Sequence, residues 1–478
     1  MLRLALVRPA TFDPAAQRLT SSSAMIAMDL LLDGLTSIDV DSGRAVPELA
    51  ASWQVSDDGL RWRFDLDRAG DDGRPLVTAA DVKWTLDRIA AVGDQSISGS
   101  SLASVVGYDE LAAGGETVGL AGVEVVRPDR LVIRLSEPFA ALPALLAHPT
   151  FGILPEGGEE ALPEAPGAWS SSRFVVDEMT DDRLVLDATD RFEGVVDGVE
   201  IRWVDDEAEA AALVTDGAVD LAPAGAGLVG VGEQEIVGPA ASTVFFGMNL
   251  ADGALADPAL RRAIVQAVNR EGLSADLFGD AAIAVAGLIP EPGRDVCGDN
   301  CTFDPDVSTQ LLEFVFGDEE PPTIRIDFVE GDDREQALAE GLAVSLRVVG
   351  IPAELAPATV TELEDRIAAG EHQLFRFGWV SGYADEQSWL DSLFRSDGPD
   401  NVFNLVDDGI DEMLDELART EAPPERRERA ETLEREILGT YVVLPLLARQ
   451  HVMAASADVD GVILRSDGTF DVELVAVD

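Results

Sequence analysis

The chain is poor in three residue types that carry much of protein chemistry, namely lysine, histidine and cysteine. Lys83 is its only lysine, so the rest of its 34 basic residues are arginine, and 90 acidic residues bring the net charge to −56. Phosphate binding needs a basic surface, so this charge excludes nucleic acid as a partner and opposes docking on anionic lipid. The acidity fits a surface kept hydrated in strong salt, and it fits a high-GC coding bias equally well. It describes solubility rather than chemistry.

The two cysteines lie close together in the sequence. Cys297 and Cys301 are separated by three residues that include glycine and asparagine, a spacing that allows a small loop closed by a disulfide. Such a bond favours an oxidising compartment. A zinc site would need further ligands, and the three histidines are remote in sequence, so we expect no metal site; they are His148, His372 and His451.

Long apolar runs and familiar catalytic motifs are also missing. No run of 18 or more apolar residues occurs, so we expect no membrane-spanning helix. Residues 1–9 are too short and too charged for the apolar part of a signal peptide and read as a first strand, so we expect any export signal to have been removed. The nucleophile elbow, the P-loop, the glycine-rich dinucleotide fingerprint, the zinc motif H-E-x-x-H and a complete EF-hand loop are all absent. The sequence therefore gives little support for an enzyme, and it indicates no cofactor.

Periodicity and capping signals predict a mixed α/β chain. Residues 60–66 alternate apolar and polar side chains, as a half-buried strand does, and Thr78 begins a helix that it caps. A helix is predicted at 257–270. A long helical region is predicted at 407–438, with a break at Pro423-Pro424. Alternating elements then predict a largely parallel sheet with right-handed crossovers: strand 323–329, helix 333–348, strand 351–355, helix 359–369 and strand 373–379. Gly/Ala-rich sequence near 223–233 indicates a lobe boundary.

A set of short motifs, in a fixed order along the chain, carries a family resemblance. Together they resemble the extracytoplasmic solute-binding proteins of ABC importers, in the family 5 branch that carries peptides, nickel and some oligosaccharides. Each motif is weak alone, and the ordered set is specific. The motifs are Leu32–Leu35, Val46–Ala50, Ser52-Trp53, Ser56–Leu60, Gly73–Val82, Asp257–Ile264 with Asn269-Arg270, Ala369–His372 before Phe377–Trp379, and Tyr441–Leu446.

The resemblance implies an architecture. We expect an α/β protein of the periplasmic-binding-protein type II class (cluster C), with two lobes that face each other across a cleft and a hinge of two crossing strands. Lobe one would be discontinuous, with an inserted subdomain. The expected bounds are 1–46, 160–239 and 447–478 for lobe one, 47–159 for the subdomain, and 240–446 for lobe two.

The resemblance also implies capture of a solute rather than chemistry. A small ligand, peptide-like or an oligosaccharide, would stabilise a closed state that docks on a membrane permease. The protein would be extracytoplasmic, periplasmic or lipid-anchored on the outer face of the cell membrane, and monomeric. Nickel and haem stay open as ligands because relatives bind them with few direct protein contacts. The alternatives are a secreted two-lobed hydrolase and a receptor of this fold used in signalling or as a chaperone.

The segment from Phe375 to Asp385 is the strongest candidate for ligand contact. By resemblance, the ring of Trp379 and the backbone after it, including Ser381, would face the ligand, which would pair with the backbone as an added strand. Core packing is the alternative for that ring. Relatives usually carry a carboxylate three residues after this tryptophan, which holds a peptide's ammonium group, and this chain has Gly382 there. Asp385 could substitute only if the loop turns differently, so a free-amine peptide is disfavoured.

Further candidates come from the same resemblance. Arg376 could meet a ligand carboxylate or pair with an acidic neighbour, and Tyr383 could face either the ligand or the core. Ser22 and Ser23 could contact ligand or cap the helix that begins there. The remaining candidates are Trp169, which could stack on a sugar or an apolar side chain, and the strand residues Phe246, Met248 and Asn249.

Overall fold

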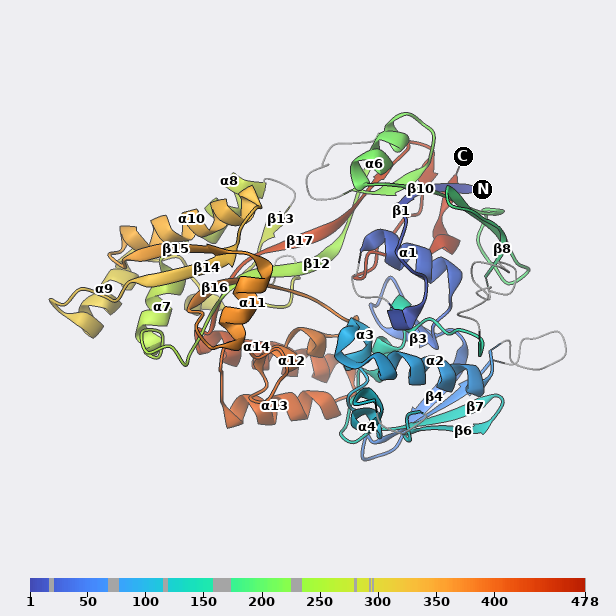
Figure 1. Ribbon diagram of the computed structural model, residues 1–478, viewed down its shortest axis with the longest axis horizontal. Helices are drawn as coiled ribbons and strands as arrows, with labels where there is room; N and C mark the ends of the chain where they lie inside the picture. Colours follow the sequence, from blue (N-terminus) through green and yellow to red (C-terminus); the bar gives the residue numbers. More distant parts are fainter. Residues whose placement is uncertain are drawn as a thin grey trace. The chain divides into compact units, whose positions relative to one another are not determined.

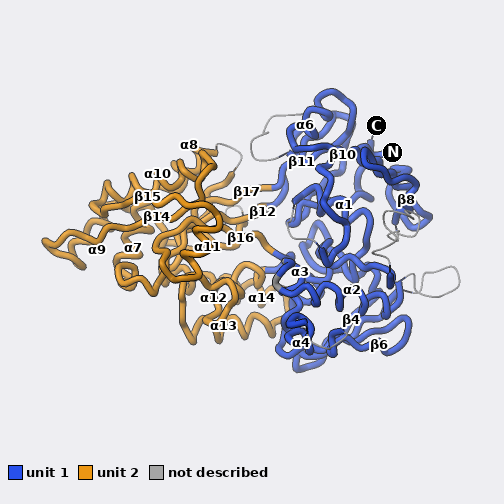
Figure 2. The backbone as a smooth tube through the Cα atoms, in the orientation of Figure 1, with its two compact units in different colours: residues 1–239, 382–385, 451–478 blue, residues 240–381, 386–450 orange. Residues whose placement is uncertain are grey.

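The protein forms two compact units, which Figure 2 distinguishes by colour. The computed structural model describes residues 1–16, 21–67, 77–114, 119–157, 173–224, 234–278, 282–291, 294 and 296–477. Unit 1 comprises residues 1–239, 382–385 and 451–478, and unit 2 comprises residues 240–381 and 386–450. Within the described ranges, no helix is long and apolar enough to cross a membrane.

Unit 1 contains a sheet built on the first strand of the chain (Figure 1). β1 (Leu2–Val7) runs parallel to β10 (Gly198–Val204) and to β11 (Leu221–Pro223), while β9 (Arg183–Ala188) and β8 (Phe174–Met179) continue the sheet as antiparallel strands. β1 is apolar at five of six positions and mostly buried, as expected for a strand covered on both faces. Two helices pack against it, α1 (Ser22–Leu31) and α6 (Glu207–Thr215).

A second, antiparallel sheet in unit 1 has the order β4-β5-β7-β6. Its strands are β4 (Ala50–Val55), β5 (Arg61–Leu66), β7 (Arg130–Arg134) and β6 (Val123–Arg127). α2 (Ala79–Val92) packs beside it, and its N-terminus carries the predicted cap: the Thr78 hydroxyl and the Asp81 carboxylate each accept from the other's backbone N–H. The alternating strand at 60–66 and the capped helix are therefore confirmed.

Unit 2 contains the predicted sheet of parallel strands (Figure 1). β14 (Ile324–Val329) runs parallel to both β15 (Ala353–Ala358) and β16 (Leu374–Val380), and the connecting helices are α10 (Asp333–Val348) and α11 (Val360–Ala368). β16 pairs antiparallel with β12 (Gln234–Met248). β17 (Val443–Ala455) pairs with β13 (Ala282–Ala284) in unit 2 and, at its other end, with β11 in unit 1.

Two predictions about helices in unit 2 have different outcomes. The break at Pro423-Pro424 is confirmed, because α13 (Asp408–Arg419) ends before these prolines and α14 (Pro423–Gly439) begins with them. Proline lacks an N–H that the first turn of a helix leaves unpaired in any case. The single helix predicted at 257–270 is wrong. α7 ends at Gln266, and Asn269 accepts from the Gly272 N–H at 3.0 Å to start a second helix.

The remaining elements are short or peripheral. The helices are α3 (Ile97–Ser100), α4 (Tyr108–Ala112), α5 (Leu142–Leu145), α7 (Pro258–Gln266), α8 (Arg270–Phe278), α9 (Pro305–Phe316) and α12 (Asp391–Phe394). The strands are β2 (Thr36–Ile38), β3 (Ala45–Pro47), β18 (Val459–Asp460) and β19 (Ala476–Val477). The 3₁₀ turns are η1 (Pro14–Ala16), η2 (Gly93–Gln95), η3 (Pro149–Phe151), η7 (Gly298–Asn300), η8 (Glu386–Trp389) and η9 (Val472–Leu474).

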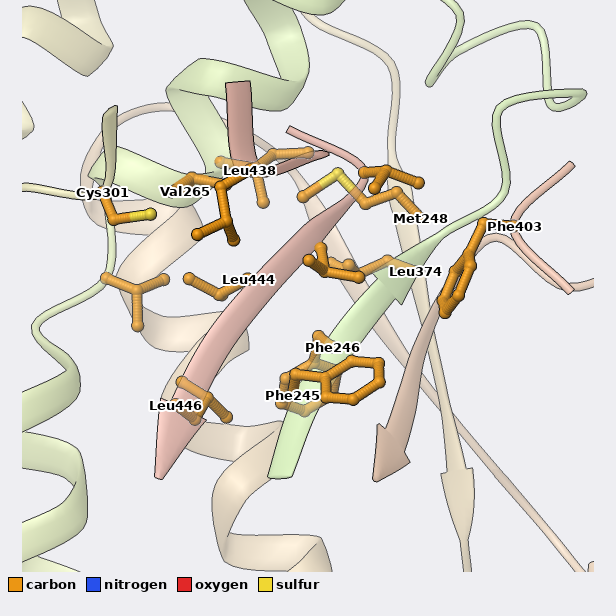
Figure 3. Packing of buried hydrophobic residues seen from close by; sticks show 14 of the residues in the cluster. Phe245, Phe246, Met248, Val265, Cys301, Leu374, Phe403, Leu438, Leu444 and Leu446 are labelled. Atoms are coloured by element: carbon orange, nitrogen blue, oxygen red, sulfur yellow. The ribbon is translucent and has the colours of Figure 1, made fainter. Parts of the chain in front are cut away.

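The core of unit 2 lies around β12, β16 and β17, as Figure 3 shows from close by. Phe403 is completely buried and stacks on Phe394 with ring centroids 5.4 Å apart and on Phe375 at 5.7 Å. Burying one side chain of this size stabilises a fold by roughly 1.5–3 kcal/mol relative to exposure. This aromatic cluster therefore holds the first half of β16 rigidly in place.

A disulfide joins Cys297 and Cys301 around η7, and both cysteines are buried. The loop is tied to its surroundings by two side chains: the Tyr441 hydroxyl donates to Asn300 Oδ1 at 3.1 Å, and Gln266 Nε2 donates to the Asp299 carbonyl at 3.2 Å. The loop is thus an anchored part of unit 2.

Candidate functional site

The second half of β16 has one edge along which no strand of the described residues pairs. β16 pairs with β12 from Leu374 to Val380, whereas its pairing with β14, as far as the structure describes the chain, covers only Leu374 and Phe375. From Arg376 onward, that edge has no neighbouring strand in the described sheet. Gly378 and Val380 are exposed there. Because an edge strand presents N–H and C=O groups that can accept an added strand, this edge is suited to an extended ligand.

Trp379 sits near the end of this edge, and its orientation is fixed. Its indole N–H donates to the Ser388 carbonyl in η8 at 2.7 Å, and part of the ring packs against the core of unit 2. Ser381 and Ser388 share a hydrogen bond between their hydroxyl groups. The ring is half-buried, and its buried portion packs in the core, as the alternative interpretation expects. Contact of the remaining portion with a ligand stays a prediction.

The next residues of the candidate segment belong to unit 1. The Tyr383 ring meets Phe139 edge-on, with centroids 5.6 Å apart, and the Asp385 N–H donates to the Tyr383 carbonyl at 2.8 Å. A Cβ added at Gly382 would have nothing within 4 Å, and its backbone φ is not in the left-handed region. The glycine at this position is therefore not required by space or by backbone conformation.

Arg376 is engaged by the protein itself. Its guanidinium forms a two-pronged ion pair with Glu335 of α10, with Nε 2.6 Å from Oε2 and Nη2 2.9 Å from Oε1. Arg449 of β17 also donates to Glu335 Oε1, at 3.1 Å. Burial lowers the pKa of Arg376, and the Glu335 carboxylate opposes this effect. Of the two roles expected for Arg376, the structure therefore shows pairing with an acidic neighbour.

The serines at the start of α1 are used internally. Ser21 caps the helix by accepting from the Ala24 N–H, and Ser23, which is buried, accepts from the Val7 N–H at 3.1 Å. Ser22 Oγ lies 3.3 Å from His451 Nδ1. Burial lowers the pKa of His451, whose Nε2 lies 3.1 Å from the Ser466 carbonyl, so the imidazole is neutral near pH 7. A ligand role for Ser22 and Ser23 stays a prediction.

The candidates on β12 lie in the interior of unit 2. Phe246 and Met248 are completely buried in the core that Figure 3 shows. Asn249 is also completely buried; its amide donates to the carbonyls of Gly370 and His372 and fixes the turn before β16. Their side chains offer no exposed surface, so ligand contact by these residues stays a prediction without support from their positions. Trp169 lies outside the described residues.

Sequence reasoning missed Glu335, Arg449 and Ser388. Glu335 lies 41 residues from Arg376 and 114 from Arg449, and with 90 acidic residues in the chain no local signal distinguishes it. Ser388 could have been found only from the turn that η8 makes after the loop.

Comparison with known proteins gives a consistent result. The family model described as "Bacterial extracellular solute-binding proteins, family 5 Middle" matches residues 44–401. The chain is 22% identical to the probable D,D-dipeptide-binding periplasmic protein DdpA of Escherichia coli K12, over 95% of this chain and 89% of that protein. It is 25% identical to the probable di/tripeptide-binding protein 5 of Pseudomonas aeruginosa, over 96% and 92% respectively.

Solved structures share the fold. The unliganded open form of the periplasmic murein tripeptide-binding protein MppA matches with a TM-score of 0.86 at 20% identity, covering 100% of this chain and 97% of that one. HbpA2 from Haemophilus parasuis matches with a TM-score of 0.83 at 16% identity, covering 100% and 99%. The predicted fold class is confirmed.

Proposed function

Because the chain belongs to family 5 of the bacterial extracellular solute-binding proteins, we propose that it captures a small peptide-like solute outside the cytoplasm and delivers it to an ABC permease. The match of the family model to residues 44–401 is the observation that carries this proposal. Two relatives that match over nearly all of the chain are named as probable dipeptide- and di/tripeptide-binding proteins, one of them periplasmic, which supports a peptide-like ligand and a location outside the cytoplasm.

The geometry of unit 2 supports the same function. The open edge of β16 offers main-chain hydrogen bonds to an extended solute whatever its side chains are, and the half-buried Trp379 offers an apolar surface beside it. Binding through the main chain gives affinity with little sequence selectivity, which suits a receptor that imports many peptides. Tyr383, whose ring meets Phe139 edge-on within unit 1, is proposed separately as a ligand contact.

Gly382 favours a second candidate ligand, an oligosaccharide. Without a carboxylate at this position, a peptide's ammonium group loses a partner, whereas a neutral sugar loses nothing. A sugar would stack on the exposed part of Trp379 instead. The permease partner and a monomeric state also belong to this proposal.

The test is to identify the solute that the protein retains. The protein is purified without denaturation, its mass is measured under native conditions, and any released solute is sequenced or subjected to sugar analysis. Trialanine and cellotriose are then titrated by calorimetry, and the mixtures are sampled over a day. We expect saturable binding with no new products. Steady accumulation of cleaved probe would instead support a hydrolase, and the absence of any retained solute or binding would contradict the proposal.

A further inference from the structure

The ion pair on β16 has an excess of positive charge. Two guanidinium groups, from Arg376 and Arg449, converge on the single carboxylate of Glu335. The three side chains are 13%, 35% and 15% exposed, so all three are partly withdrawn from water. Asp332, which caps the N-terminus of α10, adds a more distant negative charge near Arg376, and Arg334, like Arg449, lies over the Phe278 ring.

The arrangement has the chemistry of a carboxylate-binding site. Arg376 donates one hydrogen bond to Glu335, from Nη2 to Oε1, and its Nε lies close to Oε2 as a charge contact without a hydrogen bond among the described residues. Guanidinium groups recognise carboxylates through such charge-assisted contacts, and a second arginine strengthens them. Arg449 also has spare capacity, because its buried Nε makes no hydrogen bond among the described residues. Unlike an open binding site, this one already holds a carboxylate of the protein itself, that of Glu335.

This cluster touches the open edge of β16. The Arg376 guanidinium donates to the Phe377 carbonyl. It also lies over Gly378, where an added Cβ would approach Arg376 Nη1 to 3.2 Å and the Thr243 carbonyl to 3.1 Å. A larger residue at 378 would therefore crowd the Arg376 guanidinium and the Thr243 carbonyl. The charged cluster therefore lies against the main chain of β16 in the same segment, 376–380, whose edge is open.

We propose that Arg376 and Arg449 form a carboxylate-binding site that Glu335 permanently fills, so that a solute on β16 is not selected for a free carboxylate. The lack of selection for a free carboxylate rests on the proposed function, whereas the filled binding site concerns only the three side chains. An outside carboxylate that displaced Glu335 would leave this partly buried carboxylate without its cationic partners, and an unpaired buried charge is strongly destabilising. The favoured solutes are uncharged where they meet this part of the strand, as amidated, cyclic or mid-chain peptide segments are.

The first test needs no solute. Glu335→Ala removes the built-in carboxylate and leaves space between the two arginines. We expect the variant to melt at a lower temperature than the wild type in sodium chloride. We expect sodium acetate or formate at equal ionic strength to restore part of that loss, and neutral acetamide to restore none. The matched control is Glu340→Ala, an exposed position on α10 that bonds only to Gln336 among the described residues, for which acetate should change nothing.

The outcomes of this test are distinct. A variant that folds only in acetate also supports the proposal. A variant that melts equally in acetate and chloride, or that folds in neither, overturns it.

The second test uses trialanine and trialanine amide, titrated into the wild type and into Glu335→Gln, which keeps the shape and removes the charge. We expect the wild type to bind the two probes within about threefold of each other, and the variant to bind the free acid at least tenfold more tightly than the amide. A wild type that prefers the free acid by tenfold or more contradicts the proposal. If neither probe binds either protein, the peptide form of the proposed function fails, while the acetate result still decides whether the site exists.

Discussion

Glu48 is expected to make the stability of unit 1 depend on pH. It lies just before β4 and faces a buried cluster of charges, in which Asp29 and Asp33 add negative charge and Arg173 adds positive charge. The group lines a cavity of about 10 Å³, room for a single water molecule, together with Arg465. Burial and the neighbouring carboxylates raise the pKa of Glu48 from 4.5 to about 7.

The sign follows from proton binding in the two states. Between pH 4.5 and 7 the folded protein holds a proton on Glu48 that the unfolded chain has released, so the free energy of unfolding falls as pH rises through this window. One pKa unit corresponds to about 1.4 kcal/mol. Going from pH 5 to pH 8 should therefore cost roughly 2–3 kcal/mol through this carboxyl alone.

The assay compares urea unfolding of the wild type and of Glu48→Gln at pH 5 and pH 8. Because glutamine stays neutral, we expect the variant to be more stable than the wild type at pH 8. At pH 5 this difference in unfolding free energy should be smaller by roughly 2–3 kcal/mol. Taking the difference between proteins cancels His148 and His451, whose pKa values burial lowers and which act in the opposite direction. Glu110→Gln, at an exposed position on α4, is the control. A difference between wild type and variant that is the same at both pH values would refute the reasoning.

Three further predictions concern binding and stability. Gly382→Asp should fold with an unfolding free energy within about 0.5 kcal/mol of the wild type, since the site is open, and should favour free-amine trialanine over its N-acetyl form by about tenfold; calorimetry on both probes checks this, and an unchanged preference would count against a ligand near residue 382. Trp379→Phe removes the hydrogen bond to η8 and should weaken binding of trialanine several-fold while changing stability by about 1 kcal/mol; full affinity in the variant would remove Trp379 from the site. Glu434→Ala should destabilise the protein by roughly 3–5 kcal/mol in urea, because it leaves the Arg294 guanidinium without its closest partner, and the exposed Glu436→Ala should change little; equal effects of the two substitutions would contradict this account.

The sequence predicted those parts of the fold that depend on local patterns. α10 has the predicted bounds of 333–348, and the helix at 359–369 became α11 because Thr359 and Glu362 cap each other's backbone. The end of α7 was mispredicted because the apolar pattern continues past Gln266 and does not reveal that Asn269 begins a new helix.

The site was less predictable, because its geometry depends on contacts between distant segments. The motif around Trp379 indicated the right strand, but nothing near Arg376 in the sequence shows that Glu335, 41 residues earlier, occupies it. Strand alternation likewise could not show that the neighbours Phe245 and Phe246 are both completely buried, since β12 is covered on both faces there. Local sequence patterns therefore predicted the helices and strands, whereas the roles of their side chains depend on burial and on contacts between distant segments.

The chain crosses from one unit to the other four times, and two of these crossings bound a four-residue excursion, 382–385. The other two lie within the continuous strands β12 and β17. A protease that cuts only inside the excursion would therefore leave both units covalently joined, while freeing the backbone on the carboxyl side of Trp379. Limited proteolysis at this one segment would separate loss of solute retention from loss of the fold without any substitution.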